Sequence, residues 1–241
     1  MRKLTGVHSW IGLLADPIRD VVLARMRPRR FADQSPIWQV GDPSTELYLI
    51  SKGRVRIGTE SFAGTELMVA IFRAGDCFGE VGLIDGLPRF NSTYAMGDTE
   101  LLVLKKADFS ELYTSHAEIA RALNLNLCYR LRVAYGLSQD ASMLTLRQRL
   151  ARMLTRLAVT GGQSDEKGGA VVPDMSHEDL AHMLGATRQA VSRALKELEC
   201  ADEIVLSYRR ILVRDLDRFA DRYDSLVGGE WVVPDYDRKQ R

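Results

Sequence analysis

The hydrophobic pattern of this 241-residue chain changes once, near Ser115, and this change limits the folds that it can adopt. Before Ser115, apolar residues come in short runs separated by glycine, and period-two alternation is clear in residues 55–57. After it, residues 116–140 contain no proline and place apolar side chains three or four positions apart. The first pattern is typical of a sandwich or barrel-like sheet, and the second is that of a helix. The sequence therefore predicts an α+β chain whose β-rich part comes first.

The β-rich part runs from about residue 31 to residue 104. Its apolar runs are residues 47–50, 55–57, 67–72 and 101–104, and turns are expected at Gly41, Gly53, Gly64, Gly75, Gly86 and Gly97. We interpret it as a double-stranded, jelly-roll-like β-roll. Helical spacing from Trp10 to Met26 predicts a small helix packed at its start.

Composition leaves the class of partner open. Hydrophobic residues make up 46% of the chain, enough for ordinary cores, and the length suggests one or two domains. The formal net charge is +1, so any basic surface for nucleic acid must be local. Cys77, Cys128 and Cys200 lie far apart, which predicts no disulfide framework and no metal site. No run of about 18 apolar residues occurs, so we expect a cytoplasmic protein without membrane contact.

One long helix is predicted after residue 115, and its apolar stripe has two interpretations. The stripe could pack on its own domain, or it could face the same helix of a second subunit as a coiled coil. We favour a homodimer, because the β-roll already has an alternating core of its own. The predicted dimer interface consists of Leu123, Leu127, Leu131 and Ala134.

The rest of the chain predicts a second, smaller domain. We expect a helix over residues 144–159, a polar loop over 161–169, a strand over 170–172, a hairpin over 204–213 and an amphipathic segment over 216–223. The expected domains are residues 1–115 (β-rich), 116–143 (long helix, for dimerisation), 144–227 (second domain) and 228–241 (tail).

Residues 176–199, SHEDLAHMLGATRQAVSRALKELE, carry the most specific motif. Ser176 and Asp179 form a capping box that starts one helix, and Thr187 can cap a second. Gly185 lies between them, where the chain must turn sharply. Two helices joined by so short a turn match a helix-turn-helix, whose second helix enters the major groove of DNA. The predicted DNA-binding residues are Ser176, Thr187, Arg188, Gln189, Ser192, Arg193, Lys196 and, at the hairpin tip, Arg209.

Residues 78–95, FGEVGLIDGLPRFNSTYA, contain the second specific motif. Gly79 lets a backbone amide approach an anion closely, and Glu80 can accept hydrogen bonds from ribose hydroxyls. Arg89 can close over a phosphate as a planar donor fork. The predicted effector-binding residues are Gly79, Glu80, Val81, Arg89, Phe90, Asn91 and Tyr135.

Together with the preceding IWQVGDPSTELYLISKGRVRI, this segment resembles the phosphate-binding cassette of cyclic-nucleotide-binding domains. With the helix-turn-helix after a long helix, residues 11–219 resemble the Crp/Fnr family of bacterial regulators. The resemblance implies a homodimer that binds a two-fold-related operator in double-stranded DNA, contacts RNA polymerase, and changes its DNA-binding domains when an effector binds.

The chain departs from cAMP-responsive members of that family at two places. A small residue follows the arginine there, whereas Phe90 and Asn91 follow Arg89 here. A Thr-Ser pair that hydrogen-bonds adenine aligns with Ala134 and Tyr135. Three alternatives therefore stay open: cAMP or another cyclic nucleotide, a different small effector, or none.

Other functions fit the sequence less well. No cysteine precedes Cys77, which argues against an iron–sulfur sensor. A cyclic-nucleotide-binding regulatory subunit acting on a partner protein would leave the recognition helix and wing without a use. An enzyme is the weakest alternative, because no catalytic set accompanies Cys77, and Glu80 with Arg89 suits binding better than proton transfer. We expect no catalytic residues.

Overall fold

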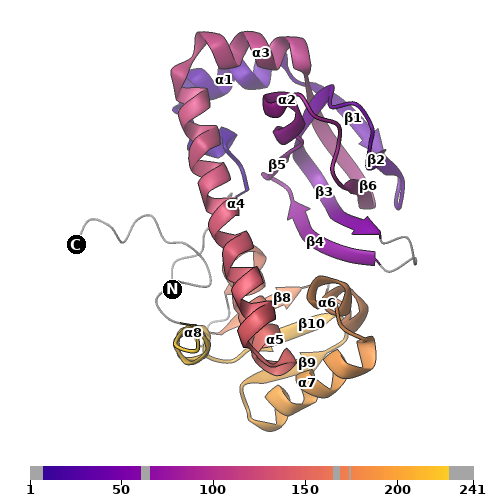
Figure 1. The fold of residues 1–241 in the computed structure, drawn as a ribbon, viewed down its shortest axis with the longest axis vertical. Coiled ribbons are helices and arrows are strands. Elements are labelled where there is room, and N and C mark those ends of the chain that lie inside the picture. The colour runs from indigo at the N-terminus through magenta and orange to yellow at the C-terminus, as the bar shows by residue number, and fades with distance from the viewer. Residues whose placement is uncertain (1–7, 61–65, 165–168, 174, 228–241) are drawn as a thin grey trace, which may run out of the picture. The chain divides into compact units, whose positions relative to one another are not determined.

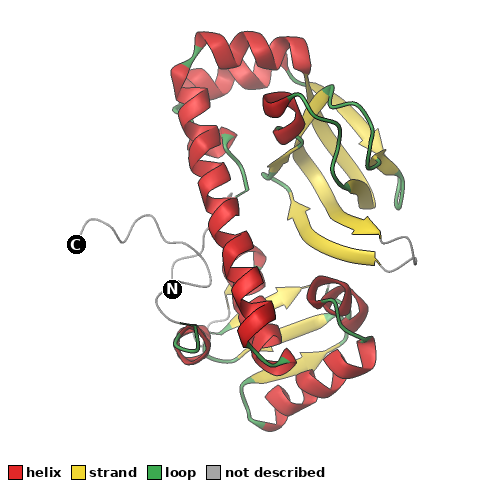
Figure 2. Cartoon of the chain, viewed as in Figure 1, coloured by secondary structure: helices red, strands yellow, loops and turns green. Residues whose placement is uncertain are grey.

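The computed structural model describes residues 8–60, 66–164, 169–173 and 175–227, which form two compact units (Figure 1). One unit extends to Cys128 and the other begins at Tyr129, so the division falls inside one helix, α4 (Ala117–Met143). The first unit is built mainly on strands and the second mainly on helices (Figure 2). The predicted α+β class is confirmed.

The first unit contains one antiparallel sheet in which β1, β6, β3 and β4 lie in that order, with β2 paired to β6 and β5 to β3. Short helices flank it (Figure 1). The elements are η1 (Ile11–Leu13), α1 (Asp16–Arg25), β1 (Arg27–Phe31), β2 (Pro36–Trp38), β3 (Glu46–Glu60), β4 (Glu66–Arg73), β5 (Cys77–Phe78), α2 (Val81–Asp85), β6 (Ser92–Lys105) and α3 (Lys106–Ser115).

The strands are longer than the sequence predicts. The expected runs 47–50 and 55–57 both belong to β3, so Gly53 does not end a strand. Its φ is 89°, and a Cβ atom there would lie 2.6 Å from Oγ1 of Thr99. Only glycine fits, and the strand shifts register around it instead of ending. Gly97, also expected in a turn between strands, lies inside β6.

The predicted helix from Trp10 to Met26 is interrupted. The structure has the short 3₁₀ turn η1 and then α1, with Pro17 in the first turn of α1. Proline has no N–H and its ring clashes with the preceding turn, so it is tolerated at a helix start but not in the middle. The turn expected at Gly64 lies outside the described residues.

The two faces of the sheet contact different cores. One core is aromatic and contains Trp38, Tyr48 and Phe78. The other packs the opposite face against η1, α1, α3 and the first turns of α4, and includes Ile119 and Leu123. Leu123 is only 1% exposed, so its assignment to the dimer interface is corrected. Its side chain fills the core of its own unit because α4 begins by packing on the roll.

The second unit is a set of helices with a small antiparallel sheet of order β7-β8-β10-β9. Helix α5 packs against α6, α7 and α8, and so forms its centre. The elements are the second half of α4, α5 (Leu146–Gly161), β7 (Gln163–Ser164), β8 (Ala170–Pro173), α6 (His177–Leu184), α7 (Arg188–Cys200), β9 (Ile204–Ser207), β10 (Arg210–Val213) and α8 (Leu216–Asp224).

Two expected boundaries in this unit move. Helix α5 begins at Leu146 rather than residue 144, because Thr145 is its N-cap and forms a capping box with Gln148. The loop expected over 161–169 is shorter, because β7 pairs with β8. Residues 165–168 and the expected tail, 228–241, lie outside the described part of the chain.

Candidate functional site

The two helices α6 and α7 have the local geometry that their sequence predicts. The backbone N–H of Asp179 donates to Oγ of Ser176 at 3.0 Å, and that of Ser176 donates to Oδ2 of Asp179 at 2.9 Å. Gly185 ends α6 in the left-handed region, with φ 58°. Thr187 then caps α7 by accepting from the N–H of Ala190 at 3.2 Å. These short-range bonds set the sharp turn between the helices.

Helix α7 has one buried face and one exposed face. Val191, Leu195 and Leu198 are fully buried against the rest of the unit. The predicted DNA-binding residues Arg188, Gln189, Arg193 and Lys196 are exposed on the other face. Arginine can pair bidentately with guanine and glutamine with adenine, so this face carries the donors and acceptors that base edges in a major groove require.

Three of the predicted DNA-binding hydroxyls already have partners within the protein. The hydroxyls of Ser176 and Thr187 cap their helices. Oγ of Ser192 lies 2.7 Å from Nδ1 of His177, at the start of α6. His177 was not predicted, although its position beside the Ser176 cap was visible in the sequence. Its hydrogen bond ties the outward side of α7 to α6.

The hairpin of β9 and β10 forms the expected wing. Ser207 pairs with Arg210, so the turn consists of Tyr208 and Arg209 alone. Arg209 is exposed with φ 51°, a left-handed conformation that non-glycine residues adopt at a cost. Tyr208 is almost fully exposed and was not among the predicted DNA-binding residues. Its position in the sequence, directly before Arg209 and Arg210, was the signal that could have identified it. The wing tip therefore presents a ring and a guanidinium to solvent.

In the cassette, Arg89 is bound inside the protein. Its Nη1 donates to the carbonyl oxygen of Gly79 at 2.8 Å, and its Nη2 donates to the carbonyl oxygen of Glu46. Its guanidinium carbon lies 4.1 Å from the centre of the Trp38 ring. The indole N–H of Trp38 donates in turn to the backbone oxygen of Asn91 at 2.9 Å. Trp38 and Glu46 were not among the predicted site residues, because only strand pairing brings them beside the cassette.

Glycine is required next to this arginine. Gly79 has φ 94°, and a Cβ atom there would lie 3.1 Å from Nη1 of Arg89. Glu80 and Arg89 are 1% and 6% exposed, so the two do not form a surface ion pair. Burial lowers the pKa of Arg89, while the nearby Tyr48 and Glu80 act in the opposite direction. The cassette thus holds a buried cation whose two Nη atoms donate to backbone carbonyls, while its Nε has no hydrogen-bond partner in the described part of the chain.

The remaining predicted effector residues are more exposed. Phe90, which follows Arg89 where cAMP-responsive members have a small residue, is 64% exposed, so its side chain points outward. Val81 begins the five-residue helix α2 and is partly buried. Tyr135 is exposed on α4 in the second unit, and its role stays a prediction.

Further along α4, an exposed apolar stripe follows the buried start of the helix. Leu131 is 57% exposed, Ala134 and Tyr135 are exposed, and Leu127 is partly buried. These side chains lie three or four residues apart, on one side of a helix. We call this set the α4 stripe. It contains three of the four residues that the sequence assigned to the dimer interface.

Other chemistry has little support. Burial raises the pKa of the Cys77 thiol to about 12, which opposes a nucleophilic role. Among the described residues, no group of three or more His, Cys, Asp and Glu could hold a metal ion. Within the same residues, no helix combines the length and apolarity needed to cross a membrane.

Comparisons with known proteins agree with both halves of this geometry. Residues 28–116 match the model of the cyclic nucleotide-binding domain, and residues 148–222 match that of the Crp-like helix-turn-helix domain. The cyclic AMP receptor protein of Thermus thermophilus is 32% identical over 195 residues, covering 81% of this chain and 87% of that protein. The CRP-like cAMP-activated global transcriptional regulator of Mycobacterium tuberculosis is 28% identical over 200 residues, covering 82% and 88%. A solved CRP-family transcriptional regulator of Thermus thermophilus has a TM-score of 0.65 at 26% identity, covering 84% of this chain and 100% of that one.

Proposed function

Because the chain belongs to the CRP/FNR family of transcription regulators, we propose that it binds a two-fold-related DNA operator as a homodimer and responds to a small effector in its β-roll. The observation that carries the proposal is the exposed face of α7, on which Arg188, Gln189, Arg193 and Lys196 stand on a capped second helix. A lone helical hairpin with a solvated face would not need the wing that follows it. Selection of operator sequences from random duplexes, followed by anisotropy titration, tests this function.

The dimer is supported by the α4 stripe. An isolated subunit would leave Leu131 and Tyr135 in water, whereas a second copy of the same helix would cover them. A dimer also brings two recognition helices to one duplex, so two weak half-site contacts become one strong one. A selected operator that consists of a single half-site, with no two-fold repeat, would contradict this arrangement.

For the effector, we propose a cyclic nucleotide, the ligand class of the relatives named as cAMP-activated or as cyclic AMP receptor protein. The glycine cradle at Gly79 and the buried cation Arg89 fit a phosphate, and the buried carboxylate of Glu80 fits a ribose. Both Nη atoms of Arg89 donate to backbone carbonyls, but Nε has no hydrogen-bond partner among the described residues, so a phosphate can bind at Nε or compete for the Nη donors. Calorimetric titration with a panel of cyclic nucleotides tests the class, and no binding by any of them would leave the other two alternatives.

We extend the proposal to the remaining roles that the family suggests. The chain then acts in the cytoplasm, contacts RNA polymerase and catalyses no reaction. Several of the relatives that it matches are named as transcriptional regulators, and the alternative of a regulatory subunit for a partner protein finds no support among them. Co-purification with RNA polymerase on operator DNA, compared with a duplex lacking the operator, tests the polymerase contact.

A further inference from the structure

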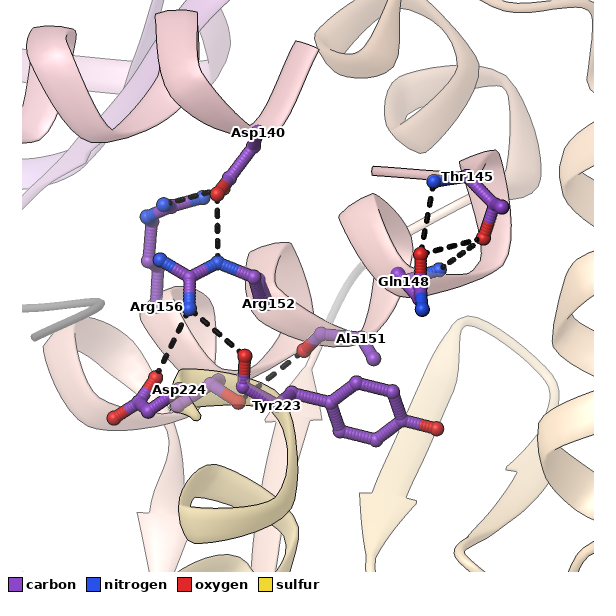
Figure 3. A network of polar contacts seen from close by, with 9 residues as sticks. Asp140, Thr145, Gln148, Ala151, Arg152, Arg156, Tyr223 and Asp224 are labelled. Atoms are coloured by element: carbon purple, nitrogen blue, oxygen red, sulfur yellow. Dashed lines mark hydrogen bonds and ion pairs between the residues drawn. The ribbon is translucent and has the colours of Figure 1, made fainter. Parts of the chain in front are cut away.

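Three buried charged side chains, Asp140, Arg152 and Arg156, meet inside the second unit where α4, α5 and α8 come together, and Asp224 at their edge lies 3.4 Å from Arg152 (Figure 3). Nε of Arg152 lies 2.7 Å from Oδ1 of Asp140, and Nη2 of Arg156 lies 2.6 Å from its Oδ2. Arg152 also donates through Nη1 to the carbonyl oxygen of Tyr223 at 2.9 Å. All three charged side chains are almost fully buried. We call this set the Asp140 clamp.

Burial at this depth makes stability an unconvincing reason for the clamp. Removing charges from water costs about as much as the ion pairs return, and apolar residues of similar volume often stabilise a core equally well. Apolar contacts are non-directional, so they do not fix the relative orientation of two helices as hydrogen-bonded ion pairs do. The carboxylate of Asp140 receives one arginine on each oxygen, and Arg152 spans from α4 to α8. This arrangement defines how the end of α4 sits on α5.

The clamp joins two functional parts of the same unit. On one side, Asp140 follows Tyr135 of the α4 stripe by five residues, about 8 Å along a helix at 1.5 Å per residue. On the other side, Arg152 and Arg156 lie on α5, which packs directly against the recognition helix α7. Gly136 of α4 lies beside Arg156, since a Cβ atom there would be in ordinary van der Waals contact, 3.5 Å from Nη2 of Arg156. These ion pairs fix α4 to α5, and α5 packs against α7, so they help to set the orientation of α7 relative to the stripe.

We propose that Asp140, held by Arg152 and Arg156, is a positioning residue that sets the spacing of the two DNA half-sites. The inference rests on the proposed function, in which the α4 stripe forms the dimer axis. In a two-fold dimer, the separation of the recognition helices must equal that of the half-sites. Inserting one base pair moves a half-site by about 3.4 Å and turns it by about a tenth of a turn, so a rigid stripe-to-α7 connection rejects wrong spacings.

The test measures spacing selectivity in the full-length protein. Anisotropy titrations use the selected operator and duplexes with one or two base pairs inserted or deleted between the half-sites. We expect the wild type to lose about tenfold or more in affinity for each changed base pair, similar to a mismatch within the site. Asp140→Asn keeps the size of the side chain but removes its charge, and should reduce this discrimination to about threefold or less while the protein stays dimeric by light scattering.

A second variant and a matched control separate positioning from folding. Arg152→Lys keeps the charge but lacks the planar fork that reaches Asp140 and Tyr223 together, and should also relax spacing selectivity. Glu203→Gln removes the ion pairs with Arg147 of α5 and Arg222 of α8, neither of which involves α4, and should leave selectivity unchanged. If Asp140→Asn does not fold, the lysine variant decides.

The outcomes distinguish the inference from the function on which it rests. A wild type that selects no operator overturns the proposed function. A wild type with clear spacing preference, together with clamp variants that keep the same preference, overturns the inference alone. Equal loss of affinity at every spacing would also overturn it, because that result means a structural role only.

Discussion

The two functional regions of this chain hold their arginines in opposite ways. In the cassette, Arg89 is buried, donates to two backbone carbonyls and stacks on Trp38. On α7, Arg188 and Arg193 are exposed at the surface of a capped helix. A ligand reaching α7 meets exposed guanidinium groups, of which that of Arg188 lies 4.0 Å from the carboxylate of Glu178, whereas a ligand reaching the cassette meets a buried guanidinium that already binds two backbone carbonyls. The α7 arginines therefore need no change in the fold to reach DNA, whereas a ligand that takes both Nη donors of Arg89 must displace these carbonyls.

This difference has an energetic consequence for regulation. A ligand that must break internal contacts spends part of its binding energy on the change, so its affinity falls. The same requirement gives the ligand a different affinity for the two arrangements, which is what a regulatory equilibrium needs. We therefore expect effector binding to change first the contacts of Trp38 with Asn91 and with Arg89.

The largest effect on operator affinity should come from a change in the α4 stripe, because the proposed dimer brings both recognition helices to the operator. Leu131→Glu places two like charges together in the proposed dimer seam, so monomers should form and operator affinity should fall by about a hundredfold or more. Light scattering and anisotropy measure the two effects. Leu125→Glu is the control, because Leu125 is also exposed but lies about a third of a turn away from Leu131. A dimeric Leu131→Glu protein with full affinity would mean that the stripe is not the interface.

Removing an exposed arginine should change DNA binding without changing stability. Arg193→Ala should weaken operator binding by about 1–3 kcal/mol and relax selectivity at one base pair per half-site. Lys196→Ala should instead weaken binding to all sequences and flatten the salt dependence. Thermal unfolding of both variants should match the wild type, because neither side chain is buried. Unchanged operator affinity of Arg193→Ala would remove this residue from the DNA interface.

Removing the buried Arg89 should instead lower the stability of the protein. Arg89→Ala leaves the carbonyls of Gly79 and Glu46 without their donor and should lower the free energy of unfolding by about 1–3 kcal/mol, as well as abolish the stabilisation by any cyclic nucleotide. Leu87→Ala, two residues away and 62% exposed, should change neither. Denaturant titration with and without ligand compares the two. An Arg89→Ala protein as stable as the wild type would show that the internal contacts carry little energy.

The smallest effect concerns the support beneath Arg89. Arg29 forms two hydrogen bonds with the Glu46 carboxylate, which hold its pKa below the ordinary range. Because the folded-state pKa is lowered, the stabilisation is present at neutral pH and is lost as the pH falls through that lowered value. The pair is partly exposed, so Glu46→Gln should cost less than about 1 kcal/mol at pH 7, and the difference should vanish in acid. Urea midpoints at both pH values test this, and an equal difference at both would contradict it.

Sequence alone determined the helix-turn-helix. Its caps at Ser176 and Thr187 and its turn at Gly185 involve residues no more than four positions apart. Such interactions act in any chain that carries them, so they can be recognised without knowing the fold. The exposed face of α7 followed from the same helical period. The β-rich first part was also predicted, but the lengths of β3 and β6 were not, because a glycine in a strand bulge resembles a glycine in a turn.

Only the tertiary structure decided what surrounds the predicted residues. Arg89 contacts the carbonyl of Glu46, 43 positions away in sequence, and Arg152 contacts Tyr223, 71 positions away. Leu123 and Leu131 share one helical pattern, yet one is buried and the other exposed. Local periodicity tells which side chains lie on one face, but what covers that face depends on long-range packing. For this reason the sequence identified the cassette arginine, and the fold determined that it is already bound.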